Sequence, residues 1–269
     1  METGTEDLLA ELDEGVLTLT LNRPQARNAM SGEMNQALQR ALADAELDRA
    51  VRCIVLTGAG KGFCAGGDVK GMARDKDGDG PTIDEAIHTQ RTNQRATAGR
   101  LYAMPKPTLA ALPGAAAGAG LSLALACDLR IMADDAFMTT AFAKVGFSGD
   151  YGGTYFMTQL VGSAKARELY FLSERVSAEE ALRLGLTNWV CPAADLAERT
   201  RAIARRLASG PTVAYRYMKE NLNRAASTGD LEDCLDLEAT HHVHCGRTQD
   251  HRSAVAAFVE KREPVFEGR

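Results

Sequence analysis

Two glycine-rich turns are the segments of this sequence whose residue types and spacing could do chemistry. Residues 57–68 (TGAGKGFCAGGD) and residues 114–120 (GAAAGAG) each follow an apolar run typical of a buried strand. Glycine lets backbone N–H groups come close to a ligand because no Cβ intervenes. Two such donors aimed at one oxygen would form an oxyanion hole, with tight backbone packing as the alternative. Neither turn has the GxxxxGK[ST] pattern, which disfavours a phosphate-binding P-loop.

A second group, His241, His242, His244 and Cys245, contains residue types that bind metals. Adjacent helix residues point apart, so only pairs three or four positions apart, such as His241 with His244, could share a face. We therefore predict a surface or interface helix here and no metal site. No residue pattern indicates a redox cofactor.

The elements around the two turns indicate an α/β core. Residues 8–12 and 16–21 alternate apolar and polar, which predicts a β-hairpin. Residues 53–56 and 108–112 are short apolar runs expected to be buried strands. Ser31 can cap a helix whose apolar residues recur at helical spacing. Strand, glycine turn, helix and strand in succession are typical of a parallel sheet with crossover helices.

The rest of the chain is predicted to be helical and variable. Residues 74–82 (RDKDGDGPT) are charged and glycine-rich, which predicts a mobile surface loop. His88, in the polar helix that follows, is expected at an exposed position. Residues 177–180 (SAEE) match a capping box. We predict an α/β core over residues 1–200 and a helical C-terminal region over residues 201–269.

Composition excludes several classes of protein. The 269 residues are 45% hydrophobic and 25% charged with a net charge of −5, so a nucleic-acid partner is not favoured. The longest apolar stretch, residues 109–127, contains Pro113 and is rich in alanine and glycine, which argues against a membrane span. The N-terminus is acidic and shows no export or organelle signal, and the six cysteines form no CxxC pair. These features predict a reduced, cytoplasmic protein.

Five motifs together resemble the enoyl-CoA hydratase/isomerase (crotonase) superfamily in order and spacing: LTLNRPQARNAM, VLTGAGKGFCAGGDVKGM, ALPGAAAGAGLSLALACDLRI, GGTYFMTQLVGSAKARELYF and SAEEALRLGLTNWVCP. The resemblance runs over about residues 8–266. It implies an α/β fold, a spiral of ββα units with parallel sheets and a helical C-terminal trimerisation region. It also implies a homo-oligomer, either a trimer or a dimer of trimers. The expected ligand is an acyl-CoA thioester, with CoA as part of the substrate and no separate cofactor.

The resemblance also places a binding site on this sequence. The backbone amides of Gly67 and Ala119 match the two oxyanion donors of the family. The residues implied in CoA binding are Arg27, Cys64, Ala65, Gly66, Gly67, Asp68, Phe258 and Lys261, the last two through a neighbouring subunit. Asp68 is expected to cap the following helix rather than to act on the substrate.

The sequence departs from the family's hydratases at their two catalytic glutamates. Those positions hold Ser122 and Phe142, neither of which titrates near neutral pH. The two-glutamate machinery for adding water is therefore absent. Both residues are instead expected to line the acyl pocket, together with Phe147 and Tyr151.

One carboxylate does match a catalytic position. Asp150, within GFSGDYGG, stands where the family's dienoyl-CoA isomerases, ring-opening isomerases and dehalogenases carry their active aspartate. Turn formation is the alternative role for an aspartate among glycines. Phe142 and Phe147 are expected to desolvate this carboxyl and raise its pKa.

A single base favours isomerisation, because it can take a proton from one carbon and return it at another. We therefore predict an enoyl-CoA isomerase that stabilises a thioester enolate, with Asp150 as acid and base. A hydratase, hydrolase or dehalogenase using Asp150 is an alternative. An inactive CoA-binding or RNA-binding paralogue is an alternative from another class.

Overall fold

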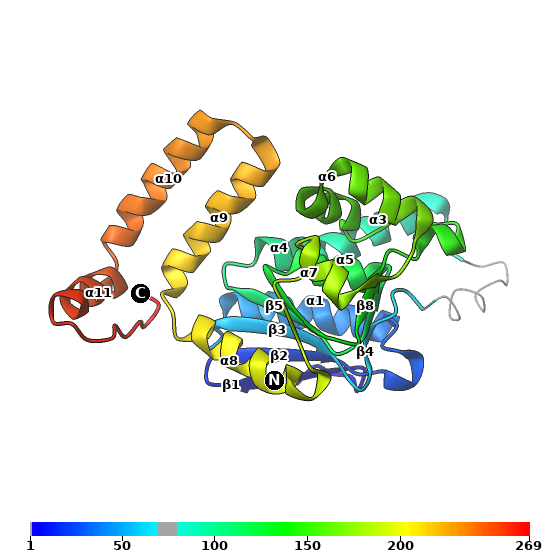
Figure 1. The fold of residues 1–269 in the computed structure, drawn as a ribbon, viewed down its shortest axis with the longest axis horizontal. Coiled ribbons are helices and arrows are strands. Elements are labelled where there is room, and N and C mark those ends of the chain that lie inside the picture. The colour runs from blue at the N-terminus through cyan, green and yellow to red at the C-terminus, as the bar shows by residue number, and fades with distance from the viewer. Residues whose placement is uncertain (1, 69–79) are drawn as a thin grey trace.

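The computed structural model describes residues 2–68 and 80–269, and two sheets organise this part of the chain (Figure 1). The larger sheet has the strand order β1-β2-β3-β5-β7-β10, and the smaller has the order β4-β6-β8-β9. The strands of the larger sheet are β1 (Leu8–Asp13), β2 (Val16–Leu21), β3 (Cys53–Gly58), β5 (Thr108–Leu112), β7 (Leu129–Ala133) and β10 (Trp189–Cys191). Those of the smaller sheet are β4 (Gly62–Cys64), β6 (Ala115–Ala117), β8 (Phe137–Thr139) and β9 (Val176–Ser177).

The larger sheet confirms the predicted hairpin and the predicted parallel strands. The hairpin strands β1 and β2 are antiparallel with Leu8 opposite Leu21, and β2, β3, β5, β7 and β10 are parallel. Strand β5 is buried at every position, as a sheet covered on both faces requires. The α/β prediction with parallel sheets is therefore correct.

The smaller sheet corrects the sequence-based interpretation. The two glycine-rich segments were expected to be turns, but each contains a three-residue strand, β4 and β6. These strands pair in parallel, with Gly62 opposite Ala115. Their carboxyl ends therefore lie at the same edge of the sheet, and the loops that follow them come together there.

The helices pack around the sheets and extend beyond them. They are α1 (Gly32–Leu47), α3 (Ile83–Gln94), α4 (Arg100–Ala103), α5 (Ala119–Ala126), α6 (Gly153–Leu172), α7 (Ala178–Arg183), α8 (Leu196–Ala208), α9 (Thr212–Thr228), α10 (Leu231–Gly246) and α11 (Gln249–Val259). Helix α8 packs against β2, β3, β5 and β7, and α1 packs against β1 and β2. Helix α8 runs across residue 200, and the following helices extend away from the sheets (Figure 1). None of the helices in the described ranges is long and apolar enough to cross a membrane.

Helix starts follow the predicted capping in part. The Ser31 hydroxyl accepts a hydrogen bond from the Met34 amide (3.0 Å) and caps α1 as predicted. Ser177 accepts from the Glu180 amide (3.2 Å), but the Glu180 carboxylate pairs with Arg183, so only half of the predicted capping box forms. A complete box stands at 82–85, at the start of α3. Most of the predicted loop 74–82 falls in residues 69–79, outside the described residues.

The C-terminal helices α9 and α10 form an antiparallel pair in which His241 is a packing residue. Its ring stacks on Tyr217 with 4.3 Å between the centroids, and its Nδ1 lies 2.5 Å from the Asn221 side-chain oxygen. His241 thus joins the two helices. Within residues 2–68 and 80–269, no three His, Cys, Asp or Glu side chains are grouped to hold a metal ion.

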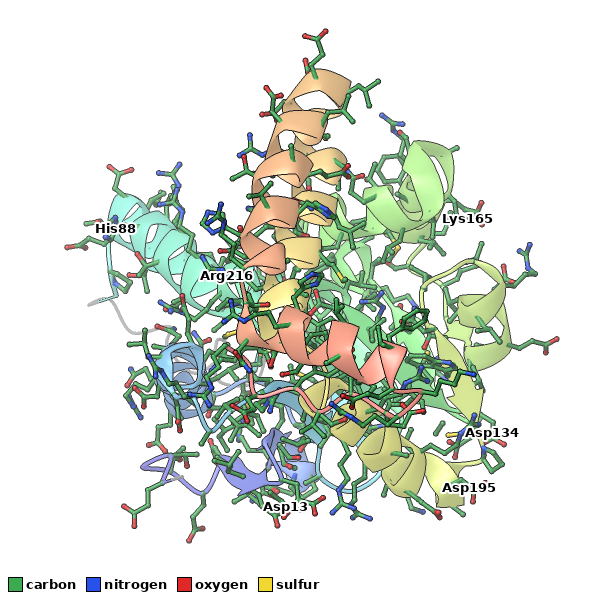
Figure 2. All side chains as sticks on the ribbon, turned by 90° about the vertical axis from the view of Figure 1, so that its left-hand side faces the viewer. Asp13, His88, Asp134, Lys165, Asp195 and Arg216 are labelled. Atoms are coloured by element: carbon green, nitrogen blue, oxygen red, sulfur yellow. The ribbon has the colours of Figure 1, made fainter. Side chains whose placement is uncertain are left out.

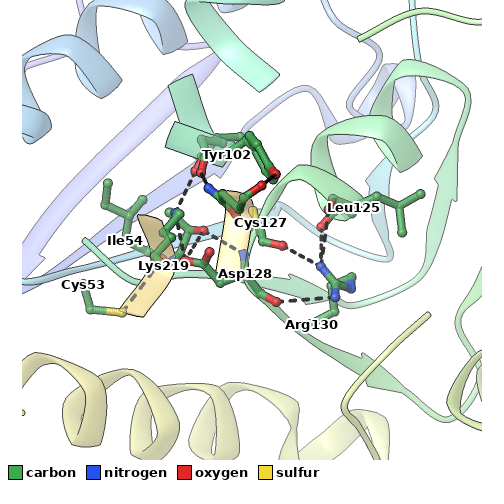
Figure 3. Close-up of polar contacts among 12 residues, drawn as sticks. Cys53, Ile54, Tyr102, Leu125, Cys127, Asp128, Arg130 and Lys219 are labelled. Atoms are coloured by element: carbon green, nitrogen blue, oxygen red, sulfur yellow. Dashed lines mark hydrogen bonds and ion pairs between the residues drawn. The ribbon is translucent and has the colours of Figure 1, made fainter. Parts of the chain in front are cut away.

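A buried lysine attaches the C-terminal region to the core (Figure 3). The Lys219 ammonium on α9 donates to the Asp128 carboxylate (3.0 Å) and to the Leu101 carbonyl (3.0 Å). The same carboxylate oxygen accepts from the Thr108 hydroxyl at 2.9 Å. A buried charge is tolerated only when it is paired and hydrogen-bonded, so these contacts fix α9 to the strand ends beneath it.

Candidate active site

The two loops predicted to supply the oxyanion donors lie side by side. A Cβ built on Gly66 would stand 3.0 Å from the Ala117 carbonyl oxygen and 3.4 Å from the Ala119 amide nitrogen. Gly66 has φ +95° and Gly118 has φ +52°, conformations that favour glycine and permit this close approach. The contact brings the segment that contains Gly67 against the start of α5.

Helix α5 presents the amide of Ala119 at its first position. The first amides of a helix have no acceptor within the helix, so they remain available to a ligand and carry the positive end of the helix dipole. Ala119 is helical, whereas Gly118 before it takes the glycine-only conformation. Alanine is therefore accommodated at position 119 without strain.

The first loop is held from the other side by the segment that follows β2. The Ala65 amide donates to the Arg27 carbonyl (3.0 Å), and the Met30 amide donates to the Gly66 carbonyl (2.8 Å). Arg27 thus lies beside residues 64–66, as predicted for a shared CoA site. Its own φ of +53° is a strained conformation that costs about 1–2 kcal/mol.

Asp68, at the end of this loop, forms an ion pair with Arg23 at 3.1 Å. Arg23 also lies 3.5 Å from the Asp7 carboxylate, so the pair links the loop to the N-terminal segment. The predicted helix cap by Asp68 concerns residues 69–79, which are outside the described residues.

Asp150 lies in a glycine-rich loop between Val145 and α6. Its neighbours Gly149, Tyr151 and Gly152 have φ values of +118°, +48° and +75°. The Asp150 carbonyl accepts from the Gly153 amide (3.0 Å), and the Tyr151 amide donates to the side-chain oxygen of Gln94 (2.5 Å). A glutamine distant in sequence therefore helps to hold the loop.

The Asp150 carboxyl is partly buried, and one of its oxygens accepts no hydrogen bond from the described residues. Burial raises its pKa to about 6. Among the described residues, its Oδ1 is buried and has no hydrogen-bond partner. Buried polar atoms are nearly always satisfied, so an exception indicates a group kept available for a ligand or a reaction.

Asp150 is also close to the strand that leads into the first loop. Burial raises the pKa of the Cys64 thiol, at the end of β4, to about 12, and the negative charge of Asp150 contributes in the same direction. Asp150 likewise contributes to the raised pKa values of the Tyr151 and Tyr170 phenols. The carboxyl and the paired loops therefore belong to one site.

Of the two phenylalanines predicted to desolvate Asp150, one is buried and the other is exposed. Phe142 is 6% exposed, lies 3.7 Å from the Cβ position of Gly118 and stacks on Tyr170 with 5.8 Å between centroids. Phe147 is 57% exposed, and its part in desolvating Asp150 stays a prediction. Tyr170 on α6, which the sequence analysis did not select, packs on the loop, since a Cβ built on Gly149 would lie 3.1 Å from its ring.

Ser122 stands beside the start of α6. Its hydroxyl lies 3.3 Å from the Gly118 carbonyl, as hydrogen-bond donor to that oxygen. A Cβ built on Gly153 would lie 2.3 Å from the Ser122 hydroxyl and 2.6 Å from the Tyr170 hydroxyl. Only glycine fits at position 153, and the tight contact joins α5 to the Asp150 loop.

Three other predicted residues lie away from this cluster. Phe258 is 84% exposed on α11, and Lys261 follows that helix, at the opposite end of the molecule from β4 (Figure 1). A contact with a neighbouring subunit's CoA stays a prediction. His88 on α3 is exposed, as expected, and its side chain is at the surface (Figure 2).

Comparisons with known proteins agree over the whole chain. The family model described as enoyl-CoA hydratase/isomerase matches residues 11–269. The chain is 39% identical to 1,2-epoxyphenylacetyl-CoA isomerase of Escherichia coli, over 98% of this chain and 99% of that protein. It is 31% identical to the short-chain-enoyl-CoA hydratase of Clostridium acetobutylicum, over 96% of each.

The solved structures give the same result. The crystal structure of an enoyl-CoA hydratase from Bacillus anthracis matches with a TM-score of 0.90 and 31% identity, covering 98% of this chain and 100% of that one. This likeness confirms the predicted crotonase-type fold. The chain therefore belongs to the enoyl-CoA hydratase/isomerase family of acyl-CoA enzymes.

Proposed function

We propose that this protein is an enoyl-CoA isomerase that moves a carbon–carbon double bond with Asp150 as its only acid and base. The observation that carries the proposal is the Asp150 carboxyl beside the paired glycine loops: its buried oxygen has no partner among the described residues, and its pKa is raised toward neutrality. A general base works best when its pKa lies near the operating pH.

In the proposed reaction the thioester carbonyl binds between the amides of Gly67 and Ala119. Asp150 removes a proton from the α carbon of a 3-enoyl thioester, and the electrons of that C–H bond move onto the carbonyl oxygen, which gives a dienolate. The two amides stabilise the resulting dienolate, each contributing about 3 kcal/mol to lowering the barrier. Asp150 then returns the proton to the γ carbon, so that the double bond moves from between the β and γ carbons to between the α and β carbons and a 2-enoyl thioester forms. The reverse reaction removes the γ proton of the 2-enoyl thioester and returns it to the α carbon.

Hydration is less well supported by the same residues. Adding water across a double bond needs one group to activate the water and a proton donor for the second carbon. Ser122 and Phe142 occupy the two glutamate positions of the family's hydratases, and neither can exchange a proton near neutral pH. A single carboxyl that shuttles one proton is sufficient for isomerisation.

The test of the proposed function is a thioester panel assayed in D₂O. We expect 3-enoyl-CoA and 2-enoyl-CoA to interconvert, with deuterium entering the α or γ carbons. Formation of 3-hydroxyacyl-CoA as the main product would replace the proposal with a hydratase. Tight CoA binding without turnover of any 2-enoyl, 3-enoyl or dienoyl thioester would support the inactive paralogue instead.

The pH dependence of turnover should follow the Asp150 carboxyl. Because the base must be ionised and its pKa is about 6, kcat/KM should level off above about pH 7 and fall about tenfold per pH unit below pH 6. With an ordinary aspartate, whose pKa is ~3.9, kcat/KM would stay unchanged as the pH falls to about 5. A pH–rate profile of the free enzyme between pH 4.5 and about 9 distinguishes these cases.

A second candidate reaction is the isomerisation of a ring epoxide. It is favoured by the 39% identity to 1,2-epoxyphenylacetyl-CoA isomerase and by the stacked pair of Phe142 and Tyr170 beside the Asp150 loop, which suits a flat ring. Adding 1,2-epoxyphenylacetyl-CoA to the panel tests it. A kcat/KM for the epoxide well above that for linear enoyl thioesters would make this the principal reaction.

The proposal includes a cytoplasmic homo-oligomer, a trimer or a dimer of trimers. The C-terminal helices that stand away from the sheets expose large apolar side chains, namely Met218, Leu222, Leu231, Leu235, Val243, Phe258 and Val259. Such side chains are typical of a surface covered by another subunit. Analytical ultracentrifugation should give a molecular mass three or six times the 28.8 kDa of the chain. The mass of a monomer would contradict the proposed oligomer.

A further inference from the structure

One peptide group, between Asp150 and Tyr151, is held at both of its polar ends. Its carbonyl, from Asp150, accepts from the Gly153 amide at 3.0 Å. Its N–H, from Tyr151, donates to the side-chain oxygen of Gln94 at 2.5 Å. Because a peptide group is planar and rigid, these two bonds fix its orientation and with it the ψ angle of Asp150.

The loop needs such a restraint. Gly149, Tyr151 and Gly152 all have positive φ values, and a segment with two glycines has other backbone conformations within reach. Within the described residues, the Asp150 carboxyl is not held at Oδ1 by any hydrogen bond. The direction of the carboxyl therefore depends on the backbone that carries it.

Gln94 is directed at the loop by an irregular helix. Helix α3 ends at Gln94, and residues Arg95–Gly99 continue it as a π-helix, so that Gly99 faces the Gln94 carbonyl. A π turn contains an extra residue and turns the side chains around it, and it is frequent at functional sites. The neighbouring Asn93 accepts from the Gln39 side chain of α1 at 3.0 Å, which fixes this helix in place.

Helix α1 also holds the other end of Tyr151. The Tyr151 phenol hydrogen-bonds to the buried Asn35 side chain, and the Tyr151 ring is itself buried. The residue after Asp150 is thus held at its amide from α3 and at its hydroxyl from α1. Gln94 is the contact that acts on the peptide group of Asp150.

We propose that Gln94 is a positioning residue that orients Asp150 for proton transfer by accepting the hydrogen bond of the Tyr151 amide. The inference rests on the proposed function, because it gives Gln94 a role only through Asp150. Gln94 is not among the residues that the family resemblance implies in CoA binding.

The test compares Gln94→Met, which keeps the length of the side chain and removes the acceptor, with Gln94→Glu, which keeps an acceptor. Gln90→Met, one turn earlier on α3, is the matched control. We expect Gln94→Met to lower kcat by about 10–100-fold with KM within about threefold, since small misplacement of a reacting group has effects of this size. Gln90→Met should keep the wild-type kcat.

Gln94→Glu should recover kcat to within about fivefold of the wild type at alkaline pH, with the acid limb of its pH–rate profile moved upward, because the added negative charge disfavours ionisation of Asp150. The shift follows from the added charge alone, so the recovery of kcat in Gln94→Glu is the readout that depends on the hydrogen-bond acceptor. A wild-type kcat in Gln94→Met, or a Gln94→Glu variant that is folded and as impaired as Gln94→Met, would overturn the inference.

A double variant separates this inference from the proposed function. If Gln94 acts through Asp150, Gln94→Met should have no further effect on the residual rate of Asp150→Asn. Full activity in Asp150→Asn alone would refute the proposed function. A large loss in Asp150→Asn together with independent, multiplying effects of the two substitutions would refute only the role of Gln94.

Discussion

Replacing Asp150 by asparagine should lower kcat for double-bond isomerisation by about 10²–10⁴-fold, the usual contribution of a positioned general base. Asparagine has nearly the same shape, so the loop and the CoA site should be preserved and KM should change little. The measurement is steady-state kinetics on the best thioester of the panel, together with the rate of deuterium exchange at the α and γ carbons.

Asp135→Asn is the matched control, because this exposed aspartate stands in the turn between β7 and β8, away from the site. It should leave both rates unchanged. An unchanged kcat in Asp150→Asn would remove Asp150 from the mechanism and leave the aspartate as a turn residue.

The second large effect is expected from Gly66→Ala. The new Cβ would stand 3.0 Å from the Ala117 carbonyl oxygen, at a φ of +95° that alanine rarely adopts. The two loops must then move apart, which would separate the Gly67 and Ala119 amides that are proposed to bind one oxygen. Loss of one oxyanion donor costs about 10²–10³-fold in kcat, and we expect a reduction within that range.

Gly62→Ala, on the strand that leads into the same loop, is the control for this substitution. A Cβ at Gly62 has open space within 4 Å, and its φ is not in the left-handed range. Thermal unfolding followed by circular dichroism should show both variants folded. A folded Gly66→Ala enzyme with wild-type kcat would show that the spacing of these loops does not matter for turnover.

Four strands of the larger sheet were predicted from the sequence, and the smaller sheet was not. Strands β1 and β2 alternate apolar and polar residues around a turn, so their pairing is visible locally. Strand β6 is three alanines and strand β4 is Gly-Phe-Cys, and three residues are too few to show the alternation of a strand. They become strands because each pairs with the other, a contact across more than fifty residues.

The candidate site shows the same division. The positions of Gly67, Ala119 and Asp150 came from motifs read along the chain, and the structure places the three segments together. Gln94 and Tyr170 were missed because their contacts with the Asp150 loop join distant segments and leave no local pattern. The capping box at Ser177 forms only in part, because the Glu180 carboxylate pairs with Arg183, a contact that the four-residue motif does not include.

The protonated state of Cys64 has a consequence for tolerance to oxidants. Peroxide and other electrophiles attack the thiolate form of cysteine, and the more scarce that form is, the slower sulfenic acid appears. With its pKa raised to about 12 next to Asp150, this sulfur is almost wholly S–H at neutral pH. We therefore expect the buried Cys64 sulfur to react with peroxide much more slowly than an ordinary exposed cysteine.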